Sequence, residues 1–183
     1  MLTVIALRLE GRRWWCACGQ PALWKSDVWS SHCSQHLLDP YSFTHFSHGL
    51  IFCGVFTLLA GLLQRRFGRT LSVPWQLCVS VVVAALWEIA ENSPFVIERY
   101  RSATMSLDYL GDSIANSLGD IGCCALGFVA ARKLGWVRSL IVFVVIELVL
   151  LAWIRDNLTL NVVMLVWPIH AIKAWQTAGH VPV

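Results

Sequence analysis

Charged side chains are scarce in this sequence. They make up 14% of its 183 residues, against roughly 25% in soluble domains, whereas 57% of the residues are hydrophobic and the mean hydropathy is +0.62. This composition argues against an ordinary soluble protein and predicts an integral membrane protein of one domain, residues 1–183. The net charge is only +3, and no basic run extends beyond Arg65–Arg66, so we expect no nucleic-acid partner.

Several functional signatures are also missing. Neither an HExxH motif nor an EF-hand loop occurs, and no internal repeat supports a transporter. Residues 1–9 are apolar but lack the charged start of a signal peptide and are too short to span a bilayer. Two explanations stay open for them, a translation start placed too late, which removes half of a first helix, or an interfacial segment. We favour the first.

The long apolar runs predict an all-α fold, a polytopic transmembrane helical bundle. A helix needs about 20 residues to cross a hydrocarbon core of ~30 Å. We therefore expect five spans, at 47–64, 74–96, 108–131, 138–154 and 157–175, and an extramembrane loop at 10–44. Several of the ten tryptophans, such as Trp75, Trp136, Trp153 and Trp175, fall near the ends of these spans, as in the aromatic belts of membrane proteins.

One polar stripe lies within the third expected span. Asp108, Asp112, Asn116 and Asp120 are each four residues apart, so they would share one face of a helix. Because polar groups inside a bilayer are costly, the stripe predicts a functional site. Asp120 would lie ~12 Å along the helix from Asp108, level with Glu147. These two buried carboxyl groups would then share a proton or a cation; the alternative is that Glu147 is protonated and bonds a backbone carbonyl.

The alternating direction of the spans brings their polar ends to one membrane face. The groups expected there are His45, His48, Glu88, Glu91, Asn92, Asp108, Asp112, Arg155, Asp156, Asn157 and Asn161. The basic residues of the opposite ends are Arg65, Arg66, Arg69, Arg132, Lys133, Arg138 and Lys173. By the positive-inside rule the opposite face is cytoplasmic and the polar face periplasmic, in a bacterial inner membrane.

The polar face offers ligands for several kinds of chemistry. A divalent metal could bind to imidazole and carboxylate groups, for which the candidates are His45, His48, Glu88, Glu91, Asp108 and Asp112. The candidate catalytic groups are His48, Glu88, Glu91 and Asp112, and the candidate substrate-binding groups are Arg99, Arg101, Asn92 and Asn116. The two arginines suit a phosphate headgroup, because a guanidinium makes bidentate bonds. The alternative is a hydrogen-bonded network that only fastens the helices together.

The expected loop contains three cysteines, Cys16, Cys18 and Cys33. In a periplasmic loop a disulfide from Cys33 to one of the others is permitted. A zinc site of Cys16, Cys18, Cys33 and His36 is the alternative, although the spacing is not that of a standard zinc finger. The four cysteines within the spans are most simply small packing residues.

Four stretches carry a family resemblance: SQHLLDPYSFTHFSHGLIF, WEIAENSPFVIERYR, DYLGDSIANSLGD and RDNLTLNVVMLVWP. Over about residues 11–176 the chain resembles a family of small alphaproteobacterial inner-membrane proteins of unknown function. It is more distantly similar to VanZ-like and YjdF-like membrane proteins. That second resemblance implies a site at His48, Glu88 or Glu91, Arg99 or Arg101, Asp112, Asn116 and Asp120.

Two classes of function remain. In the first, the protein binds or processes a lipid headgroup at the polar face, with or without a divalent metal. In the second, it is a non-catalytic subunit of a larger membrane complex. Whether the protein is an enzyme is left open by the sequence.

Overall fold

The computed structural model describes residues 1–179, which contain eight helices and no β-strand. The helices are α1 (Leu2–Leu9), α2 (Ser42–Phe67), α3 (Val73–Glu91), α4 (Pro94–Ala103), α5 (Ile114–Leu134), α6 (Trp136–Ile154), α7 (Leu158–Val166) and α8 (His170–Thr177). The prediction of an all-helical fold is therefore confirmed.

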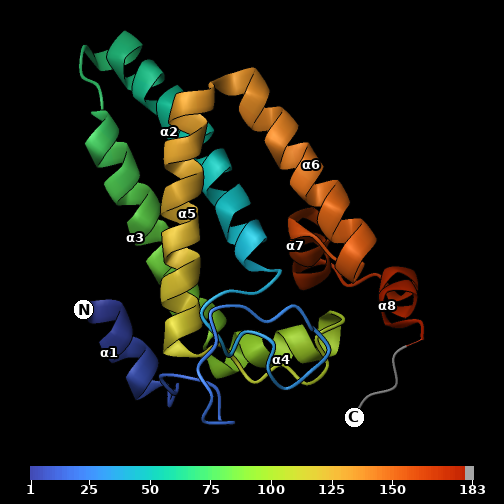
Figure 1. Ribbon diagram of the computed structural model, residues 1–183. Helices are drawn as coiled ribbons and strands as arrows, with labels where there is room; N and C mark the ends of the chain where they lie inside the picture. Colours follow the sequence, from blue (N-terminus) through green and yellow to red (C-terminus); the bar gives the residue numbers. More distant parts are fainter. Residues whose placement is uncertain (180–183) are drawn as a thin grey trace.

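Four of the helices, α2, α3, α5 and α6, are long and apolar enough to cross a membrane. α2 and α5 run away from the end of the bundle that holds the N-terminal loop, and α3 and α6 return to it (Figure 1). The predicted polytopic helical bundle is confirmed, and its helix ends converge as expected from the alternating direction.

The predicted fifth span, 157–175, is wrong. Residues 158–177 form two short helices, α7 and α8, which are separated at Trp167–Pro168. Proline lacks an amide proton and disfavours helical geometry in the residue before it, so the helix stops there. The nine residues of α7 extend for only ~14 Å. Lys173 consequently stays at the polar end, where its Nζ donates to the carbonyl of Ser102 (2.5 Å).

Two other predicted boundaries were also misplaced. The second span was expected over 74–96, but α3 ends at Glu91 because Pro94 begins a separate helix, α4. The third was expected from Asp108, but α5 begins only at Ile114, after the cap Ser113, whose side chain accepts from the amide of Asn116 (3.1 Å). Asp108 and Asp112 therefore lie on the connecting loop, and the four-membered helical stripe does not exist.

The two central helices, α2 and α5, touch backbone to backbone. A Cβ on Gly49 would overlap the carbonyl oxygen of Cys124, and one on Gly127 would overlap that of Phe46. Small residues allow such close approach in membrane bundles, where van der Waals packing replaces the hydrophobic effect. The contact continues through a buried cluster that includes Phe128, so α2 and α5 form the axis around which the site is built.

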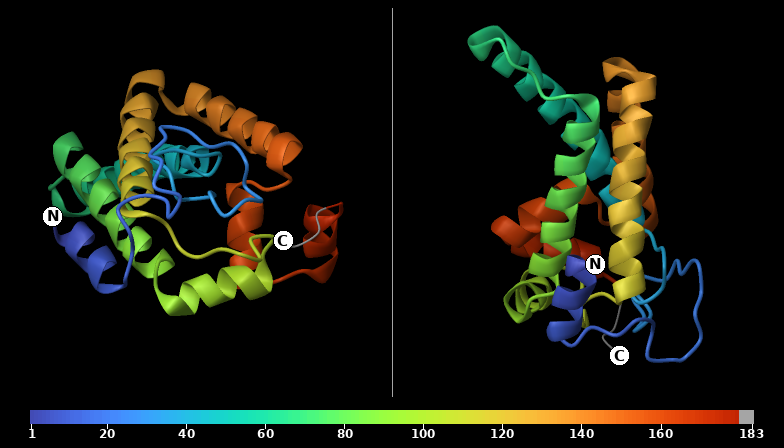
Figure 2. Two further views of the ribbon diagram at one scale, coloured as in Figure 1. Left: turned by 60° about the horizontal axis from the view of Figure 1, so that its bottom comes forward. Right: turned by 90° about the vertical axis from the view of Figure 1, so that its left-hand side faces the viewer.

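The loop between α1 and α2 folds back over the same end of the bundle as α4 and the start of α5 (Figure 2). Its carbonyl groups satisfy the free amides that begin α5. Ser113 donates to Ser34 (2.9 Å), Ile114 to Arg13 (2.8 Å), and Ala115 to the carbonyl of Trp14 (3.2 Å). Because the first amides of a helix have no partner within the helix, this loop holds the N-terminus of α5 in place.

Candidate functional site

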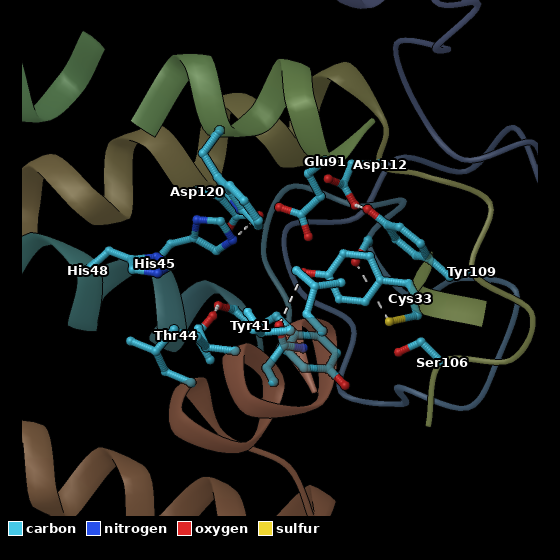
Figure 3. A pocket seen from close by; sticks show the side chains of 18 residues that line it. Cys33, Tyr41, Thr44, His45, His48, Glu91, Ser106, Tyr109, Asp112 and Asp120 are labelled. Atoms are coloured by element: carbon cyan, nitrogen blue, oxygen red, sulfur yellow. Dashed lines mark hydrogen bonds and ion pairs between the residues drawn. The ribbon is translucent and has the colours of Figure 1, made fainter. Parts of the chain in front are cut away.

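A pocket with a volume of about 260 Å³ lies at the polar end of the bundle (Figure 3). Residues of α2, α3, α4, α5 and α7 line it, together with the N-terminal loop and the loop before α5. Its polar lining consists of Cys33, Ser34, Tyr41, Thr44, His45, His48, Glu91, Tyr100, Ser106, Tyr109, Asp112, Asp120 and Asn161. Five of the eleven polar groups expected at this face line the pocket, namely His45, His48, Glu91, Asp112 and Asn161.

His45 occupies the centre of the polar groups and faces two carboxylates. Its Nδ1 lies 3.3 Å from Oε1 of Glu88, and its Nε2 lies 3.9 Å from Oδ2 of Asp120. Figure 3 shows its ring directed toward Asp120. Glu91 follows Glu88 by three residues and so shares its face of α3. His45, Glu88 and Glu91 each place one ligand atom within 4.8 Å of the other two.

Several buried atoms around His45 lack a hydrogen-bond partner among residues 1–179. Glu88 is completely buried, yet neither of its carboxylate oxygens accepts a hydrogen bond. Oε2 of Glu91, Oδ1 of Asp120, and both the side-chain oxygen and the side-chain nitrogen of the buried Asn116 also have no hydrogen-bond partner. Among the described residues, no lysine or arginine lines this pocket. Buried acidic groups are normally paired or bound to a metal, so this arrangement has room for a cation.

Asp112 belongs to a separate, fully bonded network beside this centre. It accepts from Nδ2 of Asn92 (3.1 Å) and from the hydroxyl of Tyr109 (2.8 Å), and its own amide donates to Oδ1 of Asn92 (2.7 Å). Burial raises the pKa of Asp112 to about 6, although the bonds from Tyr109 and Asn92 act in the opposite direction. The side chain of Asn92, a predicted substrate-binding residue, is thus engaged in tying the end of α3 to the loop before α5.

All three tyrosines of the chain line the pocket, and our sequence reasoning did not identify any of them. Tyr41 donates to Asp156 (3.2 Å) and Tyr100 to Asn161 (3.1 Å), while Tyr109 donates to Asp112. Burial, the largest cause, and nearby carboxyl groups raise the pKa of each well above the usual value, so the hydroxyls remain protonated donors. The sequence contains only three tyrosines beside ten tryptophans and eight phenylalanines. This low number was the one feature of the sequence that set the tyrosines apart from the other aromatic residues.

The predicted phosphate-binding arginines contact backbone carbonyls instead. Arg99 donates from Nε to Leu165 (2.8 Å) and from Nη2 to Val166 (3.2 Å), which are the last carbonyls of α7. Arg101 donates to the carbonyl of Tyr109 (2.6 Å). A cation at a helix C-terminus is favourable because it satisfies free carbonyls and complements the helix dipole. Neither arginine lines the pocket.

Two predicted acidic partners lie elsewhere. Asp108 is exposed on the loop before α5 and lines a different hollow, with Asp27, so it is not part of the metal-ligand group. Glu147 accepts from the amides of Leu158 and Thr159, both at 3.0 Å. The predicted pairing of Glu147 with Asp120 is therefore replaced by a cap on α7, because the chain turns back directly after α6. The alternative bond to a carbonyl is also wrong, since Glu147 accepts from backbone amides.

His48 lines the pocket but lies outside the group of His45, Glu88 and Glu91. Its ring centroid is 5.5 Å from that of His45, and the ring stacks on Phe52. The spacing from His45 to His48 places both on one side of α2, but only His45 reaches the two glutamates. The structure thus selects one ligand from the predicted histidine pair.

The model of a family described as "Protein of unknown function (DUF2585)" matches residues 7–178. The chain belongs to this family. A UPF0314 protein of Rhizobium meliloti is 48% identical over 177 residues, covering 96% of this chain and 85% of the relative. The UPF0314 protein of Novosphingobium aromaticivorans is 44% identical, with 98% and 89% covered, and that of Paracoccus denitrificans is 42% identical, with 97% and 88% covered.

These relatives confirm the resemblance to an alphaproteobacterial family of unknown function. No solved structure matches the chain. The more distant similarity to VanZ-like and YjdF-like proteins stays a prediction. Membership of this family is therefore established.

Proposed function

We propose that this DUF2585 protein is an inner-membrane protein that binds a divalent cation at His45, Glu88 and Glu91, and through it the phosphate of a lipid headgroup. The supporting observation is the convergence of one imidazole and two carboxylates within 4.8 Å. Two helices supply them, α2 and α3, and both helices are of membrane-spanning length. Nitrogen and oxygen ligands of this kind suit Mn²⁺, Fe²⁺ and Zn²⁺.

A cation accounts for the pocket better than a network that only fastens the helices. One nitrogen of His45 faces Glu88 and the other faces Asp120. Because a neutral imidazole carries a single proton, it can donate to only one of these two carboxylates. That leaves carboxylate oxygens of Glu88, Glu91 and Asp120 without donors among the described residues. A bound metal ion replaces the missing donors and offsets the negative charge, which removes the large cost of burying unpaired carboxylates.

The shape of the pocket supports a lipid as the further ligand. One wall is polar, whereas the wall formed by α7 is apolar and includes Leu158, Val162, Leu165 and Val166. Val162 and Val166 are also exposed on the outside of the bundle, where hydrocarbon chains of the bilayer would lie. A phosphate could therefore reach the cation and the tyrosine hydroxyls that line the same pocket, while the acyl chains follow α7.

Binding of Mn²⁺ to the detergent-purified protein tests the cation site. Mn²⁺ is the suitable probe because it prefers carboxylate oxygens, which supply two of the three ligands, to thiolates. We expect Glu88→Gln and Glu91→Gln each to weaken binding by roughly 100-fold or more, since breaking a buried charge pair costs about 3–5 kcal/mol. Asp108→Asn is the matched control, because it removes an exposed carboxylate at the same end of the bundle. Unchanged Mn²⁺ affinity in correctly folded Glu88→Gln would refute the cation site.

Lipid binding is tested on the same variants by mass spectrometry of phospholipid that co-purifies with the protein. We expect phospholipid in the wild-type protein and in Asp108→Asn, and its loss from Glu88→Gln and after removal of the metal with a chelator. If the Mn²⁺ site is present but phospholipid content is the same in all samples, the headgroup proposal fails. Stoichiometric co-purification of other membrane proteins in place of lipid would favour the alternative, a subunit of a larger complex.

A further inference from the structure

A second cluster of metal ligands lies outside the pocket, in the loop between α1 and α2. Cys16, Cys18, His32 and His36 each place one ligand atom within 4.8 Å of the other three. The sequence pattern is CxC followed by HxxxH. The predicted fourth ligand, Cys33, is not part of the cluster; its Sγ contacts the hydroxyl of Ser34 (3.7 Å), and it lines the pocket instead.

Backbone contacts bring the two halves of this cluster together. Leu37 donates to the carbonyl of Ala22 (3.2 Å), and Leu38 donates to Leu23 (3.1 Å). The backbone amide of Lys25 donates to the carbonyl of Leu38 (3.1 Å). These bonds form a parallel bridge between Trp24 and Leu38, so the two stretches of the loop run side by side in the same direction. The cysteines precede the first stretch and the histidines precede the second, which brings the two pairs toward the same end of the bridge.

Two of the separations between ligand atoms match those of a tetrahedral metal site. Sγ of Cys16 lies 3.2 Å from Nδ1 of His32, and Nε2 of His36 lies 3.3 Å from the same nitrogen. With Zn–N bonds of about 2.0–2.1 Å and Zn–S bonds of about 2.3 Å, a tetrahedron has edges of roughly 3.3 Å between two nitrogens and 3.5 Å between nitrogen and sulfur. The imidazole nitrogens face each other across a distance that one metal ion would span.

We propose that Cys16, Cys18, His32 and His36 form a structural zinc site. Two thiolates and two imidazoles are the ligand set of closed, four-coordinate zinc sites, whereas Mg²⁺, Ca²⁺ and Mn²⁺ prefer oxygen. Two of the four ligands, Cys16 and His36, are buried, at 7% and 2% exposed, while Cys18 lies at the surface. Cys33 lies outside the cluster, and all seven cysteines are free in the described structure.

The location of the cluster defines what zinc would do there. The carbonyls of Arg13 and Trp14, which accept amides at the start of α5, lie three and two residues before Cys16. Ser34, whose carbonyl accepts a third amide, lies between His32 and His36. Zinc would join these two stretches of chain. It would thus stabilise the loop that caps α5 and forms the wall of the pocket at Cys33 and Ser34. This site goes beyond the proposed cation site in the membrane and does not depend on it.

Cobalt substitution and zinc content of the purified full-length protein test this proposal. A Co²⁺-thiolate site gives a sulfur-to-metal charge-transfer band, which a site made only of histidine and carboxylates cannot give. We expect this band, and zinc at this site, in the wild-type protein. In Cys16→Ser/Cys18→Ser the band should disappear and the zinc content should fall by one equivalent per chain, because loss of ligands exceeds the roughly 10–100-fold effect of losing an outer-shell partner.

Two controls separate this site from other thiols and from the membrane site. Cys33→Ser removes a thiol from the same loop that is not a ligand, so it should retain the zinc and the cobalt band. Glu88→Gln should retain both as well, even if its Mn²⁺ binding is lost. A cobalt band that survives in Cys16→Ser/Cys18→Ser, or is lost in Cys33→Ser, would overturn the assignment of ligands.

Thiol alkylation gives a result that does not depend on the folding of a variant. In the wild-type protein, zinc should slow the alkylation of Cys16 and Cys18 and a chelator should restore it, as followed by the mass of the modified peptide. Equal alkylation of Cys16 and Cys18 with zinc and with chelator would contradict the proposal.

Discussion

Nδ1 of His45 lies 3.3 Å from Oε1 of Glu88, across the contact between α2 and α3. Both side chains are buried among helices of membrane-spanning length. In a bilayer such a pair is expensive unless it has a function or a further partner. The relationship connects the central helix of the bundle with the cluster of carboxylates, and it makes His45 the residue on which the site depends.

Replacement of His45 separates its role from that of its neighbour His48. We expect His45→Gln to weaken Mn²⁺ binding by roughly 10-fold or more, because one of three ligands is lost. His48→Gln should have a smaller effect, since His48 lies outside the ligand group. Mn²⁺ titration of both variants decides this, and equal losses would mean that both imidazoles coordinate the ion.

Glu147 should be important for folding and not for the pocket. Glu147→Ala leaves the amides of Leu158 and Thr159 without acceptors, at a cost of about 1–3 kcal/mol each. Thermal unfolding in detergent would show a lowered midpoint, with Mn²⁺ binding retained at low temperature. Glu98→Ala, which removes an exposed carboxylate from α4, should leave the midpoint almost unchanged. If Glu147→Ala changed the Mn²⁺ affinity more than the stability, the result would support the predicted pairing of Glu147 with Asp120.

The contact between α2 and α5 predicts an asymmetric response to alanine on one helix. Gly127→Ala forces a methyl group against the carbonyl of Phe46, and overpacking of this kind costs about 1–3 kcal/mol. Gly122→Ala meets nothing within 4 Å and should be neutral or slightly stabilising, because alanine is the better helix former. The measurement is the thermal unfolding midpoint of the two variants. Equal midpoints for Gly127→Ala and Gly122→Ala would contradict the close contact at Gly127.

Arg99 distinguishes a helix cap from a phosphate-binding group. Because its guanidinium satisfies the last carbonyls of α7, Arg99→Met should lower the unfolding midpoint while the co-purified phospholipid stays unchanged. Arg99→Lys should recover part of the stability, since a cation near a helix C-terminus contributes about 0.3–1 kcal/mol. Loss of phospholipid without loss of stability would instead support the phosphate-binding role.

Acidic groups outside the spans set the pH dependence of stability. Burial is the largest cause that raises the pKa of both Asp112 and Asp156 to about 6. Between about pH 4 and 6 the folded state therefore holds protons that the unfolded chain has released. The contribution of these protons to the free energy of unfolding is fully present below about pH 4 and is lost as the pH rises through about 6. We expect the unfolding midpoint to fall between pH 4 and 7, and Asp112→Asn to flatten part of this fall. A midpoint that rises over this range would contradict the direction of these shifts.

The four long spans and the meeting of their polar ends were predictable from the sequence. An apolar run of this length is stable in a bilayer as a helix, because a helix satisfies every backbone polar group within the segment. Alternate ends of successive spans must then lie at one face. His45, Glu88, Glu91 and Asp112 were identified by this reasoning alone.

Which of the polar groups touch was decided only by the tertiary structure. The spacing of Asp108 and Asp112 fitted a helix, but the free amides of α5 are satisfied by loop carbonyls more than 75 residues earlier, so the helix begins later. Glu147 caps α7 because the chain reverses after α6. His32, and not Cys33, joins Cys16 because backbone bonds set the register of the loop. Sequence periodicity describes one element at a time, whereas these contacts depend on how different elements pack together.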